Sequence, residues 1–229
     1  MKSANSSAGR GPNPRGKANA GRLTRQTDQN AVTGLEVQPL TTDRFADLAE
    51  LFNEGGDPKW CWCQYFRKAG LDWTNSTTAG NRAGLEALAA RPDLAPGLVG
   101  YRDGRVVGWV SLAPREDYGR LTNAKVLARV DDQPVWSVVC FVVSKGARGQ
   151  GVAAAMLNGA IAYARQRGAT MLEAYPVSAT RGRISPANAF HGVQSMYEKA
   201  GFSVVAERQW NKTTPLRPIM RLELVRPTA

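Results

Sequence analysis

The feature that most restricts the fold of this chain is a glycine-rich loop between a strongly apolar segment and an amphipathic helical pattern. The apolar segment is Val135–Val143, and the loop is Ser144–Gly151. From Ala153 to Ala164, small and apolar residues recur with the spacing of one helix face. A strand that is apolar on both faces is typical of the covered centre of a sheet. The pattern therefore predicts a central strand that leads through a glycine loop into a helix.

A glycine loop at the start of a helix favours the binding of an anion. Glycine lets backbone N–H groups point outward without interference from Cβ, and the first turn of the helix adds unpaired N–H donors. The spacing of Gly146, Gly149 and Gly151 differs from the G-x-G-x-x-G dinucleotide fingerprint, and no Lys-Ser/Thr pair follows as in a Walker loop. We therefore expect a phosphate site of another kind, with an ordinary strand-to-helix turn as the alternative.

Periodic patterns on either side of this unit predict the remaining secondary structure. Alternating or apolar runs predict six further strands, near residues 35–40, 96–101, 106–112, 171–175, 202–207 and 219–225. Helical spacing predicts one helix that begins at Phe45 and two more over residues 78–90 and 193–199. Asp103-Gly104 predicts a tight hairpin turn between the second and third strands. The order of these elements predicts an α/β fold with a mixed central sheet flanked by helices.

The first 33 residues differ in composition from the rest of the chain. They are rich in Gly, Ser, Asn and Ala, and they carry six basic residues against the single Asp28. Such a segment buries too little apolar surface to offset the loss of chain entropy. We predict a disordered basic tail over residues 1–33 and one folded domain over residues 34–229. For the tail, a solvated leader is favoured over an arm that contacts nucleic acid.

Two blocks of sequence give the chain a resemblance to a known family. Arg148-x-x-Gly151-x-Ala153 is similar to the R/Q-x-x-G-x-G/A signature of the GNAT N-acetyltransferase superfamily. Met196–Phe202 resembles its second signature, in which a tyrosine on a short helix precedes a Gly-Phe strand start. The resemblance covers about residues 35–225, and Val135–Val138 and Arg217–Leu222 extend it to an actinobacterial branch. It implies a mixed, mostly antiparallel sheet that is splayed between the fourth and fifth strands.

The resemblance also implies acetyl-CoA as the acyl donor and a primary amine as the acceptor. The backbone groups that would bind the pyrophosphate are those of Arg148, Gly149, Gln150, Gly151, Val152 and Ala153. The main chain of Phe141, Val142 and Val143 would pair with the pantetheine arm as an added strand does. The N–H of Val142 or Val143 would then polarise the thioester carbonyl.

Acetyl transfer to an amine needs a neutral nucleophile, a donor for the developing oxyanion and a proton for the departing thiolate. Tyr197 is the candidate acid, because a phenol with a pKa of about 10 stays protonated at pH 7. A packing role is the alternative for this tyrosine. Many relatives use a glutamate on the central strand, but Val135–Val143 has none. Glu173 is the candidate base, with an ion-paired carboxylate as its alternative, and a bound neutral amine would need no base. Carboxylates that could act through water are Glu116, Asp117, Asp131 and Asp132.

An aromatic segment, Trp60–Phe66, lies in the region that folds over the acceptor site in the resembling family. Aromatic faces form apolar walls and attract cations, so Trp60, Trp62 and Phe66 are candidate substrate-binding residues, with core packing as the alternative. His191 is a further candidate contact, because the pKa of imidazole lies near neutrality. The expected acceptor is a small-molecule amine. The alternatives are a protein lysine or N-terminus, and a non-catalytic acyl-CoA-binding regulator with the same fold.

Composition limits the location and the other partners of the chain. The formal net charge of +11 favours anionic ligands, of which CoA is one and nucleic acid another. Three cysteines are too few for a disulfide framework and suit a reducing cytoplasm, and we expect no metal site. No apolar run approaches the roughly 18 residues that cross a bilayer, and no secretory signal is expected. A homodimer is expected by analogy alone.

Overall fold

A computed structural model describes residues 34–178, 190–214 and 216–224 of the chain. The tail predicted over residues 1–33 lies outside the described residues. In the part of the chain that the structure covers, no helix combines the length and the apolar character needed to cross a membrane.

The centre of the molecule is one seven-stranded sheet, with the strand order β1-β2-β3-β4-β5-β7-β6 among the described residues. Every neighbouring pair is antiparallel except β4 and β5, which are parallel. The bounds of the strands are β1 Leu35–Pro39, β2 Gly97–Arg102, β3 Arg105–Pro114, β4 Trp136–Val143, β5 Met171–Ala174, β6 Ser203–Arg208 and β7 Arg217–Glu223. This confirms the predicted mixed, mostly antiparallel sheet.

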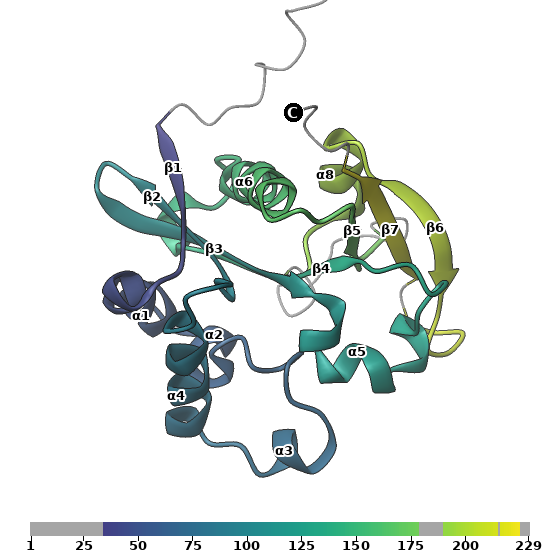
Figure 1. Ribbon diagram of the computed structural model, residues 1–229, viewed down its shortest axis with the longest axis horizontal. Coiled ribbons are helices and arrows are strands. Elements are labelled where there is room, and N and C mark those ends of the chain that lie inside the picture. Colours follow the sequence, from purple (N-terminus) through teal and green to yellow (C-terminus); the bar gives the residue numbers. More distant parts are fainter. Residues whose placement is uncertain (1–33, 179–189, 215, 225–229) are drawn as a thin grey trace, which may run out of the picture.

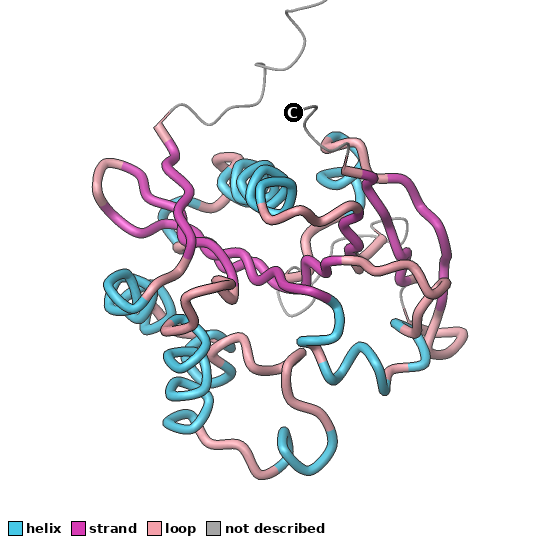
Figure 2. The backbone as a smooth tube through the Cα atoms, viewed as in Figure 1, coloured by secondary structure: helices cyan, strands magenta, loops and turns pink. Residues whose placement is uncertain are grey.

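Helices cover the sheet on both faces (Figure 1). Their bounds are α1 Phe45–Asn53, α2 Asp57–Cys61, α3 Gly70–Thr74, α4 Thr78–Ala89, α5 Gly119–Asn123, α6 Val152–Gln166 and α8 Gln194–Lys199. Figure 2 shows α6 on one side of the sheet and the helices from α1 to α5 on the other. The short α2, α3 and α5 were not predicted, because five residues are too few to show a helical period.

The sheet opens between its fourth and fifth strands, as the resemblance implied. β4 pairs with β5 only from Trp136 to Val138, whereas its pairing with β3 continues to Val143. Beyond Val138 one edge of β4 therefore has no strand beside it within the described residues. The edge ends at the glycine loop, so the opening of the sheet and the loop form one continuous region.

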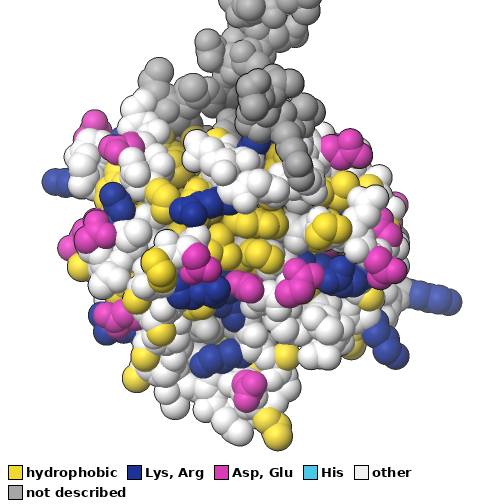
Figure 3. All heavy atoms as spheres, in the orientation of Figure 1, with side chains coloured by type: hydrophobic (Ala, Val, Ile, Leu, Met, Phe, Trp, Pro, Cys, Tyr) yellow, Lys and Arg dark blue, Asp and Glu magenta, His cyan; other side chains and the backbone are white. Residues whose placement is uncertain are grey.

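The apolar core consists of layers on the two faces of the sheet. Met156, Leu157 and Ala160 of α6 are fully buried against one face. On the other face α1 packs onto β3, and the Phe52 ring lies edge-on to Trp109. Figure 3 shows hydrophobic side chains gathered near the middle of the viewed face, with charged side chains around them. Burial on both faces explains why β4 is apolar except for Ser137, whose hydroxyl bonds that of Tyr175.

Candidate functional site

The loop between β4 and α6 has the backbone geometry of an anion site. Gly149 and Gly151 have φ angles of +74° and +78°, a region that L side chains rarely adopt. Gly151 is the N-cap of α6, so no side chain caps the first turn, and its N–H groups remain donors. A Cβ at Gly146 or Gly149 would meet nothing within 4 Å. The loop is thus open on the side where a ligand would approach.

The beginning of the loop is fixed to α1 by a single carboxylate. Glu54 accepts hydrogen bonds from Ser144 Oγ at 2.7 Å and from the Lys145 N–H at 3.0 Å. Lys145 Nζ donates to the Glu54 carbonyl at 2.9 Å. These bonds hold the turn in one shape before any ligand arrives, which reduces the ordering that binding would require.

The remaining side chains of the loop turn back onto the protein. Gln150 Nε2 donates to the Gly146 carbonyl at 2.8 Å, and Arg102 Nη1 donates to Gln150 Oε1 at 2.5 Å. Arg148 Nε donates to the Val143 carbonyl at 3.3 Å, so its charge stays beside the loop. A cleft of about 740 Å³ lies next to the loop, between α1 and the β2–β3 turn. The arrangement of backbone donors, glycines and cations fits a diphosphate.

The open edge of β4 carries the next group of candidate residues. Val142 and Val143 are partly exposed, whereas Phe141 is buried. The Phe141 N–H donates to the Phe190 carbonyl at 2.7 Å. In this conformation one of the main-chain groups assigned to the pantetheine arm therefore already has a partner within the chain. Sequence reasoning gave no indication of this contact.

Tyr197 lies in α8 and is completely buried. Its ring packs edge-on against Phe202 and Phe141, with centroid distances of 5.2 and 6.4 Å. Its hydroxyl donates to the His191 carbonyl at 2.9 Å. Burial, with a smaller contribution from Cys140, raises the pKa of the Tyr197 phenol well above its ordinary value. The phenol therefore remains a proton donor over the whole physiological range.

His191 is only 5% exposed and sits among aromatic rings. Its ring centroid lies 4.0 Å from that of Phe190 and 5.4 Å from that of Phe66. Burial and, to a lesser degree, the positive charge of Arg217 lower the pKa of His191 to about 3, although a hydrogen bond with the Val139 backbone opposes the shift. His191 Nδ1 has no hydrogen-bond partner among the described residues. The imidazole is thus neutral at pH 7 and has an unused nitrogen.

The burial of His191 predicts a loss of stability in mild acid. Its folded pKa of about 3 lies below the value of about 6.5 expected for the unfolded chain, so the unfolded state takes up the proton first as the pH falls. Stability should be complete above pH 6.5 and fall by up to about 1.4 kcal/mol per pH unit below it. We expect His191→Asn to flatten this slope in urea unfolding between pH 6 and pH 4. Since His191 is the only histidine, equal slopes for both proteins would refute this assignment.

Glu173 is fully enclosed in an ion-pair network. Its Oε1 accepts from Arg115 Nη1 at 2.9 Å and from the Tyr175 hydroxyl at 2.6 Å, and its Oε2 accepts from Arg221 Nε at 2.8 Å. Arg221 also pairs with Asp131 at 2.6 Å. With only 1% of its surface exposed, Glu173 has the environment of the ion-paired alternative. Both oxygens of the Glu173 carboxylate are thus already bonded to donors of the protein.

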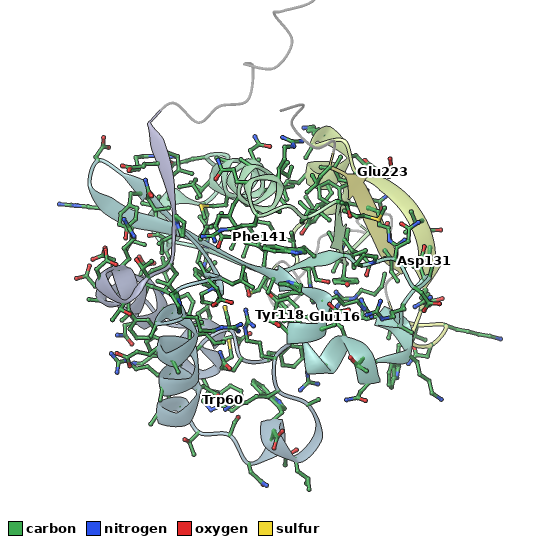
Figure 4. The ribbon with its side chains drawn as sticks, in the orientation of Figure 1. Trp60, Glu116, Tyr118, Asp131, Phe141 and Glu223 are labelled. Carbon is green, nitrogen blue, oxygen red and sulfur yellow. The ribbon has the colours of Figure 1, made fainter. Side chains whose placement is uncertain are left out.

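The three aromatic candidates of the acceptor side do not lie together. Trp62 is buried, and its ring stacks on Phe45 with centroids 5.9 Å apart, so it is used in core packing. Trp60 is 44% exposed and lies toward α3, well away from Phe141 on β4 (Figure 4). Of the three, Phe66 packs against His191. The structure thus brings Phe66 and His191 into contact, whereas Trp60 is connected to Phe66 only through the rings of Trp73 and Tyr65.

Several residues at this end of the sheet were missed by the sequence analysis. Arg115, Tyr175 and Phe190 show no local pattern that separates them from ordinary charged or aromatic residues. Arg115 reaches Glu173 across 58 positions of the chain, and Phe190 reaches Phe141 across the opening of the sheet. The signal that points to such a network is the placement of Glu173 on a strand that is otherwise apolar.

Comparison with known proteins places these features in a family context. The sequence matches a model described as the acetyltransferase (GNAT) family over residues 59–202. No curated protein matches the sequence at a significant level.

Two solved structures are similar to the fold. An agmatine N-acetyltransferase, a mutant in its apo form, shares 12% identity with a TM-score of 0.52, and the match covers 83% of this chain and 99% of that chain. An acetyltransferase of the GNAT family from Desulfovibrio desulfuricans shares 14% identity with a TM-score of 0.51, and the match covers 84% and 100% of the two chains. At these identities the likeness shows the fold alone.

Proposed function

Since this chain belongs to the GNAT family of acetyltransferases, we propose that it transfers an acetyl group from acetyl-CoA to the primary amine of a small molecule, by direct attack in a ternary complex. The observation that carries the proposal is the Gly149–Ala153 turn, which opens α6 with unpaired backbone donors beside the free edge of β4. We propose that residues 34–229 form the acetyltransferase domain and that residues 1–33 lie outside it.

In this proposal the donor site consists mainly of backbone groups. The amides of residues 148–153 bind the pyrophosphate, helped by the positive end of α6 and by Arg148. Phe141–Val143 line the pantetheine arm along the open edge of β4. When bound, acetyl-CoA supplies an activated acetyl thioester. The backbone N–H groups of this edge then hold the thioester carbonyl and oppose the charge that develops on its oxygen.

We assign the acid role to Tyr197 because its phenol is protonated, buried and next to β4. Its ring lies edge-on to that of Phe141, and its hydroxyl bonds the His191 carbonyl, which is next in the chain to the carbonyl that accepts the Phe141 N–H. From there it can give a proton to the sulfur that leaves when the amine attacks, and the proton that the amine nitrogen loses on forming the amide restores the phenol. A buried donor acts more strongly than an exposed one, since water does not compete for its hydrogen bond.

Removing the Tyr197 hydroxyl should reduce turnover much more than donor binding. We expect Tyr197→Phe to lower kcat by at least about tenfold, since general acids commonly contribute more than this, and not to weaken the binding of acetyl-CoA. Steady-state kinetics and calorimetry measure the two quantities. Tyr163→Phe is the matched control, because Tyr163 is also buried and its hydroxyl accepts the Ala95 N–H, at 3.1 Å, away from the proposed site. If both variants lose activity equally, Tyr197 is a packing residue.

For the acceptor site we propose Phe66 as a wall and His191 as the polar contact. The unused Nδ1 of a neutral imidazole can accept an N–H of the amine and so orient its lone pair. This contact positions the amine, and it does not require His191 to take up a proton from it. A neutral amine bound in this way attacks without a strong base, which agrees with the ion-paired state of Glu173.

The cover of this site supports a small acceptor. The Arg120 N–H donates to the Phe66 carbonyl at 3.0 Å, and Arg120 Nε donates to the Tyr65 carbonyl at 2.6 Å. The Arg120 guanidinium also lies over the Tyr65 ring, 4.0 Å from its centroid. These bonds tie α5 to the segment that carries Phe66. A tied cover of this kind suits a compact amine better than a protein chain.

The proposal is tested by release of free thiol from acetyl-CoA in the presence of single amines. The set should contain amino acids, polyamines, amino sugars and a lysine peptide. Turnover with a small amine and a Kd for acetyl-CoA in calorimetry are the expected results. Turnover with the lysine peptide alone would show that the acceptor is a protein amine and not a small molecule. Binding of acetyl-CoA without turnover by any amine would favour a non-catalytic acyl-CoA-binding protein.

A further inference from the structure

One short segment occupies two hydrogen-bond donors of the proposed site. The Phe190 carbonyl accepts the Phe141 N–H at 2.7 Å. The next carbonyl in the chain, that of His191, accepts the Tyr197 hydroxyl at 2.9 Å. Phe141 lines the proposed donor site and Tyr197 is the proposed acid. The two bonds come from adjacent residues, so one movement would break both.

The segment is wedged into the opening of the sheet. Val177, which follows β5, donates its N–H to the Gly192 carbonyl at 3.4 Å and forms a parallel bridge with Val193. The Phe190 ring lies beside His191 and within 6.5 Å of the Phe66 centroid. Residues 190–192, which we name the wedge, therefore lie against the β4 edge that β5 leaves uncovered.

Gly192 fixes the shape of the wedge at its end. Its φ angle is +77°, and a Cβ there would come within 2.7 Å of Met196 and 3.0 Å of the Tyr197 ring. A side chain at this position would thus have a strained backbone and a collision with α8. The wedge therefore passes close to the Tyr197 ring on its way to β4. This explains why the contact with the Phe141 N–H and the contact with the Tyr197 hydroxyl occur together.

We propose that the wedge is an internal competitor of the acyl donor, which occupies the Phe141 N–H and the Tyr197 hydroxyl until acetyl-CoA displaces it. The inference rests on the proposed function, because it concerns the regulation of that same site. Both donors are buried, and a buried donor without an acceptor is costly, so each must keep a partner before the donor arrives. The wedge carbonyls supply those partners, and the ligand exchanges them for its own acceptors.

Displacement of the wedge makes binding ordered. His191 belongs to the wedge and is only 5% exposed, so its Nδ1 becomes accessible to the amine only after acetyl-CoA has moved residues 190–192. Acetyl-CoA should therefore bind first and the amine second. The apparent affinity for acetyl-CoA is also lower than the intrinsic one, because it is proportional to the fraction of molecules in which the wedge is open.

Fluorine NMR of the full chain tests the displacement directly. A 4-fluorophenylalanine at Phe190 reports whether its ring is packed or free, through line broadening by a water-soluble paramagnet. We expect broadening to increase as acetyl-CoA saturates the protein. The same label at Phe52, which belongs to α1 and is buried against Trp109 of β3, should not respond. If broadening at Phe190 is unchanged or smaller in the saturated protein, the wedge stays in place and the inference fails.

A variant that loosens the wedge gives a second, independent reading. Phe190→Ala removes the ring that packs on His191 and Phe66, and it should tighten acetyl-CoA binding about three- to tenfold in calorimetry. Tyr65→Ala is the control, since Tyr65 packs edge-on against Phe66, with centroids 5.0 Å apart, but does not touch the wedge. Unchanged or weaker binding by Phe190→Ala would overturn the inference. Absence of acetyl-CoA binding by the wild type would instead overturn the proposed function itself.

Discussion

Gly151→Asp is expected to remove acetyl-CoA binding almost completely. A carboxylate at the N-cap of α6 would lie where the pyrophosphate is proposed to sit, close to the same backbone donors. Two unit charges 4 Å apart repel by about 4 kcal/mol near a protein surface, and even half of this repulsion weakens binding by about 30-fold. We therefore expect a Kd at least about 30-fold higher in calorimetry. The fold should persist, because aspartate tolerates positive φ better than most residues.

Gly168→Asp is the matched control for this experiment. Gly168 ends the same helix, its φ of +79° is nearly the same as that of Gly151, and a Cβ there would meet nothing within 4 Å. The control therefore introduces the same side chain at the same backbone angle, at the opposite end of α6. Similar losses in both variants would mean that the effect is structural. Full affinity in Gly151→Asp would show that the phosphate site lies elsewhere.

The sheet and the loop could be predicted from the sequence because their signals are local. The apolar run Val135–Val143 became β4 at Trp136–Val143, and the helix face that begins at Ala153 became α6 from Val152. Each element is long enough for its period to stand out from noise. The positive φ angles of Gly149 and Gly151 are likewise a local consequence of residue type. Such features need no knowledge of distant contacts.

The chemistry around Glu173 and Phe190 could not be predicted, because long-range contacts decide it. Nothing near Glu173 in the sequence shows that Arg115 and Arg221 will meet it, since they come from a turn after β3 and from β7. The same holds for Phe190, whose contact with β4 is made by its backbone carbonyl, an acceptor that every residue carries. Burial likewise turned Trp62 into a core residue, although its aromatic neighbours suggested a pocket wall. Residue type gave the candidates, and topology selected among them.

Glu173→Gln should mainly destabilise the protein, which separates the two roles considered for this residue. Glutamine keeps the shape but removes the charge that neutralises Arg115, whose side chain is 3% exposed, and it leaves Arg221, 8% exposed, with Asp131 as its remaining ion-pair partner. Removing one partner of a buried ion pair commonly costs about 3–5 kcal/mol, because the other charge stays buried without compensation. We expect the free energy of unfolding to fall by about 3 kcal/mol and the Tm by about 6–12 °C. Urea and thermal unfolding measure both values.

Activity per folded molecule then decides the role of Glu173 in catalysis. Measured well below the Tm of the variant, kcat should fall by less than about tenfold if Glu173 is an anchor, since losing a true general base costs about a hundredfold or more. Glu116→Gln provides the control, because Glu116 pairs with Arg129 at an exposed site where ion pairs contribute under about 1 kcal/mol. A hundredfold loss of kcat with unchanged stability would make Glu173 the base. With the expected result, the nucleophile is the bound neutral amine, which is oriented by His191 and needs no general base.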